Sequence, residues 1–337
     1  MKKKIFCALL GLFLISSCEN KITSLGELQS NFYAFKEKPL HLGEILNVEF
    51  NANLDKIDSV SMTLNGKSFQ NNSPLDSTNS TLGLNKLQMK VYIDNDYILG
   101  ETDVPVLSSF KETPVEFEVA KEYPHPTELF TEGFFFHNNK IYESAGQKGK
   151  SKLVNYSLGT TRYIQEKKQD AEDFSEGIAL LDGKIYQLTY RQRKIFVYDE
   201  NSLALLETLQ LPQMVREGWG MTTNGKELIL SDGTQNIFFF DAKFNLQRKI
   251  QVAGYVSIYT NLNELEFINN EIYANVWQTN YILVINPETG MVKRYYDLTT
   301  LSETTQNDDV LNGIASYNGN LLVTGKNWNK IYELTSK

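Results

Sequence analysis

Cysteine is scarce in this chain, whose 337 residues contain two, Cys7 and Cys18. Both lie in the segment 1–18, which has the character of a cleavable leader. If Cys7 is removed with that leader and Cys18 carries lipid, the mature chain has neither a thiol nor a disulfide. Catalysis by a cysteine nucleophile is therefore excluded.

Histidine and clustered positive charge are scarce as well. The three histidines are His41, His125 and His137, and a zinc site built from them would have to bring two separate regions together. A metal-dependent hydrolase is accordingly disfavoured, while calcium held by carboxylates stays open. The formal net charge is −8 and no basic block is present. This argues against a nucleic-acid partner, because phosphate binding needs clustered Lys and Arg.

Long apolar runs are missing too. The run at residues 5–15 follows three lysines and is too short to span a bilayer, as expected for a signal peptide. It ends in "ISSC", which resembles a bacterial lipobox, so residues 1–18 are predicted to be a lipoprotein signal with Cys18 acylated. A plain secretory signal with an incidental cysteine is the alternative. The favoured prediction is a protein held at the bacterial cell envelope by lipid, on either the periplasmic side or the cell surface.

Residues 19–115 are rich in Asn, Ser, Asp and Lys. Short strand-like pieces separated by turn residues appear in this segment as "ILNVEFNA", "SVSMTLNG", "KLQMKVYID" and "PVEFEVA". They predict a small immunoglobulin-like β-sandwich. No catalytic constellation is visible in it, so a role as spacer or docking module is favoured.

Residues 117–337 contain a repeat. A pattern of a polar residue and Gly, an apolar run, a turn and a second apolar run recurs at intervals of roughly 43 to 49 residues. The five copies are "EGFFFHNNKIYES", "EGIALLDGKIYQL", "WGMTTNGKELILSD", "NELEFINNEIYAN" and "NGIASYNGNLLVT". A third strand follows each copy, which predicts an all-β, five-bladed β-propeller with one blade per repeat.

Equivalent positions of the repeats are expected to form rings, because the innermost strand of every blade lines the central channel. The first ring holds Glu132, Glu176, Trp219, Asn263 and Asn312, and the second holds Gly146, Tyr190, Thr234, Trp277 and Lys326. Carboxylates, amides, indoles and an ammonium at equivalent places are typical of a functional site grafted on a scaffold. The alternative is that these positions are solvated turn residues at the rim of the channel, which vary freely.

The same stretches resemble the plant and bacterial glutaminyl-peptide cyclotransferases, a family of five-bladed propellers. The matching pieces run from Phe130 to Trp328 and include "FSEGIALLDGKIYQLTY", "GWGMTTNGKELILSDGT", "LNELEFINNEIYANVWQT" and "LNGIASYNGNLLVTGKNW". The resemblance implies cyclisation of an N-terminal glutamine to pyroglutamate with loss of ammonia. Its substrates would be peptides or proteins that begin with glutamine.

Site roles follow from the resemblance block by block. Glu176 would be the acid/base residue, Asn263 would bind substrate, and Lys326 would stabilise charge on the carboxamide oxygen. The other predicted substrate-binding residues are Glu132, Tyr190, Trp219, Trp277 and Asn312. The chemistry needs neither metal nor cofactor, although the resemblance also raises a structural calcium in the channel, without assigned ligands.

Two positions depart from the plant pattern. The plant form has "FTQG" where this chain has "FTEG", so Glu132 adds a second carboxylate whose effect on pH dependence or substrate choice is open. Tyr190 stands where the plant form has Trp, which is a tolerable aromatic exchange. Two other functions stay open at this stage: a non-catalytic propeller scaffold on a lipid anchor, and a calcium-dependent propeller lactonase.

Overall fold

The computed structural model describes residues 21–302 and 310–337 of the chain. The leader and the lipobox Cys18 lie outside the described residues. Nearly all regular structure in the described part is β-sheet, and no helix there is long and apolar enough to cross a membrane.

The N-terminal part is built on one long hairpin. Its strands are β6 (Gly83–Ile93) and β7 (Asp96–Leu107), and buried and exposed side chains alternate strictly along β6. This alternation places every second side chain of the hairpin in one apolar core. The other strands and short helices are β1 (Leu40–His41), β2 (Ile45–Leu46), β3 (Ser59–Leu64), β4 (Lys67–Phe69), β5 (Ser73–Pro74), η1 (Phe32–Glu37) and η2 (Leu54–Lys56).

These strands form a five-stranded sheet in the order β1-β7-β6-β3-β4 and a two-stranded sheet of β2 and β5. This arrangement does not itself show an immunoglobulin-like sandwich, which stays a prediction. One strand was placed wrongly, since "PVEFEVA" does not belong to this part. Its residues fall in β8 (Thr113–Pro114) and β9 (Phe117–Pro124), which pair with strands of the C-terminal part.

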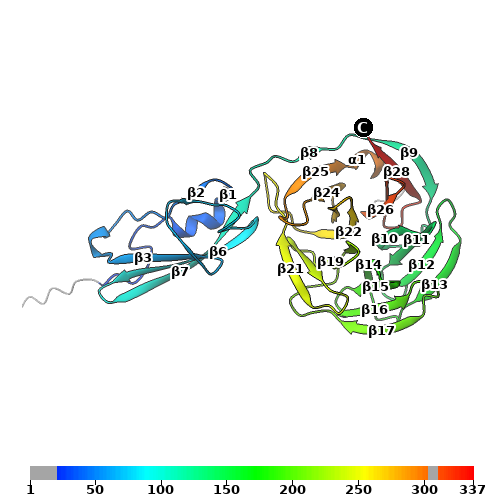
Figure 1. Ribbon diagram of the computed structural model, residues 1–337, viewed down its shortest axis with the longest axis horizontal. Helices are drawn as coiled ribbons and strands as arrows, with labels where there is room; N and C mark the ends of the chain where they lie inside the picture. Colours follow the sequence, from blue (N-terminus) through cyan, green and yellow to red (C-terminus); the bar gives the residue numbers. More distant parts are fainter. Residues whose placement is uncertain (1–20, 303–309) are drawn as a thin grey trace, which may run out of the picture.

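The remainder forms five sheets, here called blades 1 to 5, set in a propeller-like ring (Figure 1). They are antiparallel except where β8 pairs with blade 4. The inner strands contact one another around the ring, and the first inner strand contacts the last. Blade 1 contains β10 (Thr131–His137), β11 (Lys140–Ala145), β12 (Lys152–Ser157) and β13 (Tyr163–Lys168). Blade 2 contains β14 (Ser175–Leu181), β15 (Lys184–Thr189), β16 (Lys194–Asp199) and β17 (Leu205–Gln210).

The other three blades follow the same plan. Blade 3 contains β18 (Met221–Thr223), β19 (Leu228–Ser231), β20 (Asn236–Phe240) and β21 (Leu246–Gln251). Blade 4 contains β22 (Leu262–Ile268), β23 (Glu271–Val276), β24 (Tyr281–Ile285) and β25 (Val292–Asp297), with β8 added at its edge; the short helix α1 (Thr299–Ser302) follows. Blade 5 contains β26 (Leu311–Tyr317), β27 (Asn320–Gly325), β28 (Lys330–Ser336) and β9, which arrives from before blade 1.

Apolar side chains of the middle strands hold the ring together. Each of five buried clusters lies between two neighbouring blades: 1 and 2, 2 and 3, 3 and 4, 4 and 5, and 5 and 1. The middle strands are therefore buried on both faces, as in β15, whose residues after Lys184 are all buried. The repeats predicted from the sequence are these blades.

A β-bulge interrupts the inner strand of four blades at the residue that the repeat aligns. The registers shift across Glu132 in blade 1, Glu176 in blade 2, Asn263 in blade 4 and Asn312 in blade 5. A bulge bends its strand and re-aims a side chain. The polar residue at the start of each inner strand is thereby released from the ladder at one end of the channel.

The residue after each bulged position has little room. A Cβ atom added to Gly177 would lie 2.4 Å from the backbone nitrogen of Met221, and one added to Gly133 would lie 2.6 Å from that of Ile178. Glycine allows this close approach of neighbouring inner strands. Blade 4 has Glu264 at the equivalent position, and that side chain is fully buried.

Candidate active site

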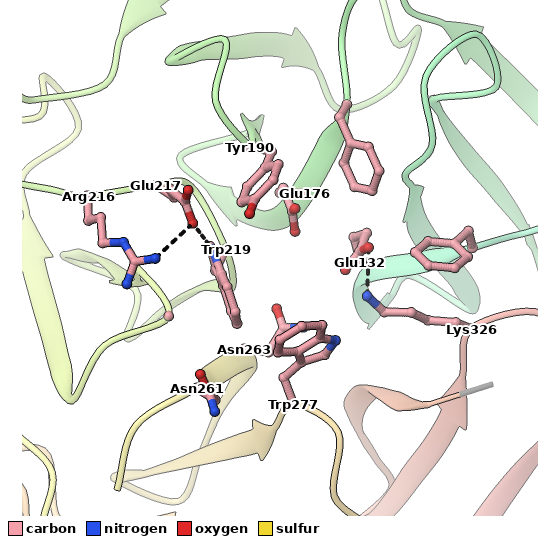
Figure 2. A pocket seen from close by; sticks show the side chains of 13 residues that line it. Glu132, Glu176, Tyr190, Arg216, Glu217, Trp219, Asn261, Asn263, Trp277 and Lys326 are labelled. Atoms are coloured by element: carbon pink, nitrogen blue, oxygen red, sulfur yellow. Dashed lines mark hydrogen bonds and ion pairs between the residues drawn. The ribbon is translucent and has the colours of Figure 1, made fainter. Parts of the chain in front are cut away.

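Three of the four bulged residues, Glu132, Glu176 and Asn263, open into a cavity of about 330 Å³ at one end of the ring (Figure 2). This volume lies within the range of small-molecule sites. The cavity is lined by Phe130, Glu132, Phe174, Glu176, Tyr190, Arg216, Glu217, Trp219, Gly233, Asn261, Asn263, Trp277 and Lys326.

One side of the cavity holds two carboxyl groups and a lysine (Figure 2). The Lys326 ammonium donates to Glu132 Oε1 at 2.7 Å and lies 4.6 Å from the centre of the Phe130 ring. The ion pair is buried, with side chains only 7% and 2% exposed. Because each charge has a partner, both can be carried in a site with little water.

Glu176 is almost as buried as Glu132, yet it forms no ion pair within the described residues. Burial raises the pKa of Glu176 well above its ordinary value, and the charge of Glu132 raises it further. The lysine opposes this rise only in part. The raised pKa favours the protonated form of Glu176, which is the form that a general acid needs.

Two indoles form the apolar wall. The rings of Trp219 and Trp277 meet edge to face, with centroids 5.6 Å apart and an angle of 85° between their planes. Gly233 has φ +76°, and a Cβ atom there would lie 2.6 Å from the Trp219 indole. A glycine at this turn thus lets the indole lie flat against the backbone.

Asn263 presents an unused acceptor to the cavity. Its side chain is 3% exposed, and its Oδ1 atom has no hydrogen-bond partner. A buried amide oxygen without a partner costs free energy of roughly 1–3 kcal/mol. A bound molecule with an N–H group would satisfy this atom, which is consistent with the predicted role of Asn263 in binding substrate.

The outer rim carries charges that the repeat alignment missed. Glu217 accepts hydrogen bonds from Arg191 Nε at 2.8 Å and from Trp219 Nε1 at 3.2 Å. These bonds outweigh burial and lower the pKa of Glu217. The Arg191 guanidinium also lies over the Tyr190 ring, 4.7 Å from its centre. Glu217 orients Trp219 and is the ion-pair partner of both Arg191 and Arg216.

The sequence therefore predicted most of the cavity but not all of it. Glu132, Glu176, Tyr190, Trp219, Asn263, Trp277 and Lys326 line it together. Asn312 does not line it; its amide donates to Thr131 O at 2.8 Å and Glu132 Oε2 at 3.1 Å. Gly146 and Thr234 of the second predicted ring also fall outside the lining. A side chain at position 146 would strike the Phe174 ring at 2.6 Å.

Comparisons with known proteins agree with this geometry. The family model described as glutamine cyclotransferase matches residues 98–336. This chain belongs to the glutamine cyclotransferase family. A glutaminyl-peptide cyclotransferase of Arabidopsis thaliana is 36% identical over 233 residues, which cover 66% of this chain and 72% of the plant protein. The crystal structure of Myxococcus xanthus glutaminyl cyclase is 30% identical and covers 67% of this chain and 99% of its own, with a TM-score of 0.62.

The family resemblance raised a structural calcium in the channel, which would need backbone or amide oxygens besides any carboxylate of this cyclotransferase homologue. Within residues 21–302 and 310–337, no group of three or more His, Cys, Asp or Glu side chains converges to hold a metal ion. Glu264 lies inside the ring, but one carboxylate is far from the six to eight oxygen ligands that Ca²⁺ takes. The calcium stays a prediction, and no step below passes through it.

Glu264 is a fully buried carboxyl group of this family member. Both its oxygens are buried without a hydrogen-bond partner, and the backbone N–H groups of Phe134 and Ile314 face it without closing a bond of normal geometry. Burial raises its pKa well above the ordinary value, and the nearby Glu266 raises it further. The other four aligned repeats have glycine at the equivalent position, so Glu264 departs from the repeat.

Glu264 should make the folded protein less stable as pH rises. Between its unfolded pKa and its raised folded pKa, the folded state keeps a proton that the unfolded state has lost. Stability therefore falls by about 1.4 kcal/mol per pH unit in that window. In Glu264→Gln this contribution disappears, so urea midpoints measured from pH 5 to pH 8 should decline less steeply than in the wild type.

Glu207→Gln, on the exposed strand β17, is the matched control and should keep the wild-type slope. A Glu264→Gln protein whose stability declines in parallel with the wild type would contradict the assignment of a raised pKa to Glu264.

Proposed function

We propose that this protein cyclises the N-terminal glutamine of peptides or proteins to pyroglutamate and releases ammonia. The observation that carries the proposal is the convergence of Glu176, Asn263 and Lys326 beside two indoles in one cavity of a glutamine cyclotransferase family member. The α-amine and the γ-carboxamide of glutamine belong to one residue. The site therefore has mainly to hold the rotamer in which the amine faces the carboxamide carbon, and such orientation supplies several kcal/mol.

The residues of the cavity suit each part of this reaction. Trp219 and Trp277 hold the aliphatic part of the glutamine and exclude water. Asn263 binds the substrate through its free amide. Lys326 faces the negative charge that develops on the carboxamide oxygen, which is the kind of fixed electrostatic stabilisation that lowers a barrier most. Glu176 moves the proton that the leaving nitrogen needs.

Ammonia release from a peptide that begins with glutamine tests the proposal. We expect turnover with Gln-initiated peptides, and far slower turnover with Glu-initiated peptides, because a carboxylate is a poor electrophile. The alternative, a scaffold without catalytic activity, predicts binding and no ammonia. A lactonase would open lactones and depend on calcium. Absence of ammonia release from Gln-initiated peptides of varied sequence would overturn the proposal.

We also propose that the protein works at the bacterial cell envelope, held by lipid on Cys18, with the N-terminal part as a spacer. The "ISSC" sequence after an apolar run supports this. Cys18→Ala should leave the protein soluble or with its leader uncleaved, as judged by membrane fractionation and mass. A variant that partitions into membranes like the wild type would show that the anchor lies elsewhere.

A further inference from the structure

The hairpin of β6 and β7 ends in an exposed apolar surface. Tyr92, Tyr97 and Leu99 are 36%, 50% and 57% exposed, and we call the surface that they form the tip patch. The strands pair Tyr92 with Tyr97 and Lys90 with Leu99, so these side chains share the outer face of the sheet. The two tyrosine rings have centroids 6.0 Å apart, and the Lys90 ammonium lies 4.9 Å from the centre of the Tyr97 ring.

The first described residues of the chain lie beside this patch. Lys21 Nζ donates to Asp96, the first residue of β7, at 2.8 Å. Ile22 is buried in the same apolar core as Ile93, the last residue of β6. A hollow of about 310 Å³ is lined by both segments, with Lys21 and Ile22 on one side and Ile93, Asp96 and Tyr97 among the residues on the other. The packing of Ile22, more than the exposed ion pair, therefore fixes where the chain enters the N-terminal part.

The proposed lipid anchor is very close to this entry point along the chain. Cys18 precedes Lys21 by three residues. Three residues span at most about 11 Å even when they are fully extended. If Cys18 carries the lipid, its backbone lies at the membrane surface. Lys21, and the tip patch beside it, must then lie within a short distance of the bilayer.

The opposite end of the hairpin is fixed to the propeller. Gln251 of blade 3 accepts a hydrogen bond from Leu84 N and donates one to Leu84 O, both at 2.9 Å. The His41 ring also packs on Tyr255, with centroids 4.6 Å apart. Leu84 and Tyr92 are eight residues apart on β6, which is about 27 Å along a strand. The N-terminal part thus extends away from the propeller and has the tip patch at its far end (Figure 1).

The charges at the tip do not make it a basic surface. Two lysines, Lys21 and Lys90, are found there together with three aspartates, Asp58, Asp94 and Asp96. Attraction to anionic headgroups needs clustered Lys and Arg and is therefore not the source of any affinity for lipid. Tyrosine has an apolar ring and a polar hydroxyl group, which suit the boundary between the acyl chains and water. The composition of the patch matches a neutral membrane interface.

We propose that the tip patch rests on the lipid bilayer to which Cys18 is attached, with Tyr92, Tyr97 and Leu99 at the level of the headgroups. The proposal rests on the lipid anchor proposed above and is independent of the cyclisation reaction. A lipid on a short tether restricts the position of the protein but leaves its tilt free. Contact through the tip patch fixes the tilt, so that the N-terminal part holds the propeller and its cavity away from the membrane. The bilayer also covers apolar side chains that would otherwise favour association between proteins.

Quenching of a fluorescent label by lipid tests the proposal. With Cys7 removed and the Cys18 thiol consumed by lipid, a cysteine introduced into the chain is labelled at one site. Ser59→Cys places the label on an exposed residue that pairs with Tyr92 across the sheet. Ser68→Cys is the matched control, because Ser68 is an exposed serine of the same sheet that pairs with Thr63, further from the tip.

The acylated full chain is reconstituted in vesicles of phosphatidylcholine that contain a spin-labelled phosphatidylcholine as the quencher. Quenching at position 59 should be several-fold stronger than at position 68. It should be unchanged by added salt, since the contact is apolar.

Tyr97→Thr combined with Leu99→Thr, in the chain labelled at position 59, separates contact from mere nearness. Threonine keeps the strand preference but removes most of the apolar surface. Quenching at position 59 should fall towards the level of position 68. Leu84→Thr, at the other end of the same strand, is the matched control and should leave quenching unchanged. Each single substitution should act in the same direction as the pair, and decides the question if the double variant does not fold.

Equal quenching at positions 59 and 68 of the anchored chain would overturn the proposal. Undiminished quenching in the double variant would also overturn it, since the tether alone would then account for the nearness, and so would loss of quenching at high salt. Self-quenching that grows with protein density, without quenching by lipid, would assign the patch to a second copy of the chain instead. A wild-type chain that does not float with the vesicles is a failure of the lipid anchor itself. That failure is seen before any label is measured, and it removes this contact as well.

Discussion

Glu176→Gln should lower kcat by about 10²- to 10⁴-fold while KM and the melting temperature stay close to wild type. Glutamine keeps the shape of the side chain and its place at the bulge of β14, but it has no ionisable proton to give to the leaving nitrogen. The loss should therefore appear in the chemical step rather than in binding. Single-turnover measurements of ammonia release, alongside titration of peptide binding, separate the two.

Glu207→Gln on the outer strand of the same blade is the control and should have the wild-type rate. A Glu176→Gln enzyme with wild-type kcat would remove Glu176 from the mechanism, even if ammonia release itself is confirmed.

Lys326→Met should lower kcat by roughly 10²- to 10³-fold, the loss typical for removal of one group that stabilises an oxyanion. Methionine keeps the length of the side chain and its contact with Phe130, so the cavity retains its shape. The positive charge that faces the carboxamide oxygen is lost, and Glu132 loses its counter-ion. Steady-state kinetics on a Gln-initiated peptide measure the effect.

Lys330→Met is the matched control for this variant. Lys330 begins the next strand of the same blade, and its ammonium pairs with Glu122 at the outer edge. It should have wild-type activity. A Lys326→Met enzyme as fast as this control would mean that the oxyanion is stabilised by another group.

The repeat pattern was sufficient to predict the blades and the side chains that the bulges expose. Glu132, Glu176 and Asn263 occupy equivalent places, so the alignment finds them directly. Asn312 is at the equivalent position in the sequence, but its amide does not line the cavity. It donates hydrogen bonds to Thr131 O and the Glu132 carboxylate instead. A pattern of residue types does not say which neighbour a polar side chain will meet.

The rim residues were missed for a different reason. Arg216 and Glu217 lie on the irregular segment between β17 and β18, and Asn261 lies just before β22. They enter the cavity through loop geometry, which has no period to detect. The sequence did offer one indication of Glu217, because a carboxylate two residues before Trp219 can reach the indole N–H. In the structure Glu217 accepts a hydrogen bond from that N–H.

The strand "PVEFEVA" was assigned to the wrong part of the chain because its sequence is equally suitable for any antiparallel edge. Its partner is β28, from Lys330 to Ser336, about 200 residues further along the chain. The sequence around a strand does not indicate a partner so distant in the chain. The last repeat as aligned had a third strand but no fourth, which was the available evidence that a strand from elsewhere must complete the blade.

This closure of blade 5 by β9 sets the order in which the site is assembled. Glu176 and the two indoles belong to blades 2 to 4, which are synthesised before Lys326; Lys326 lies between β27 and β28, the strand that pairs with β9. Until Lys326 and β28 have been made, Glu132 has no counter-ion, and β9 is an open edge. A nascent or C-terminally clipped chain would thus have a nearly complete ring without β28, and the proposed oxyanion site would be the last part of the cavity to form.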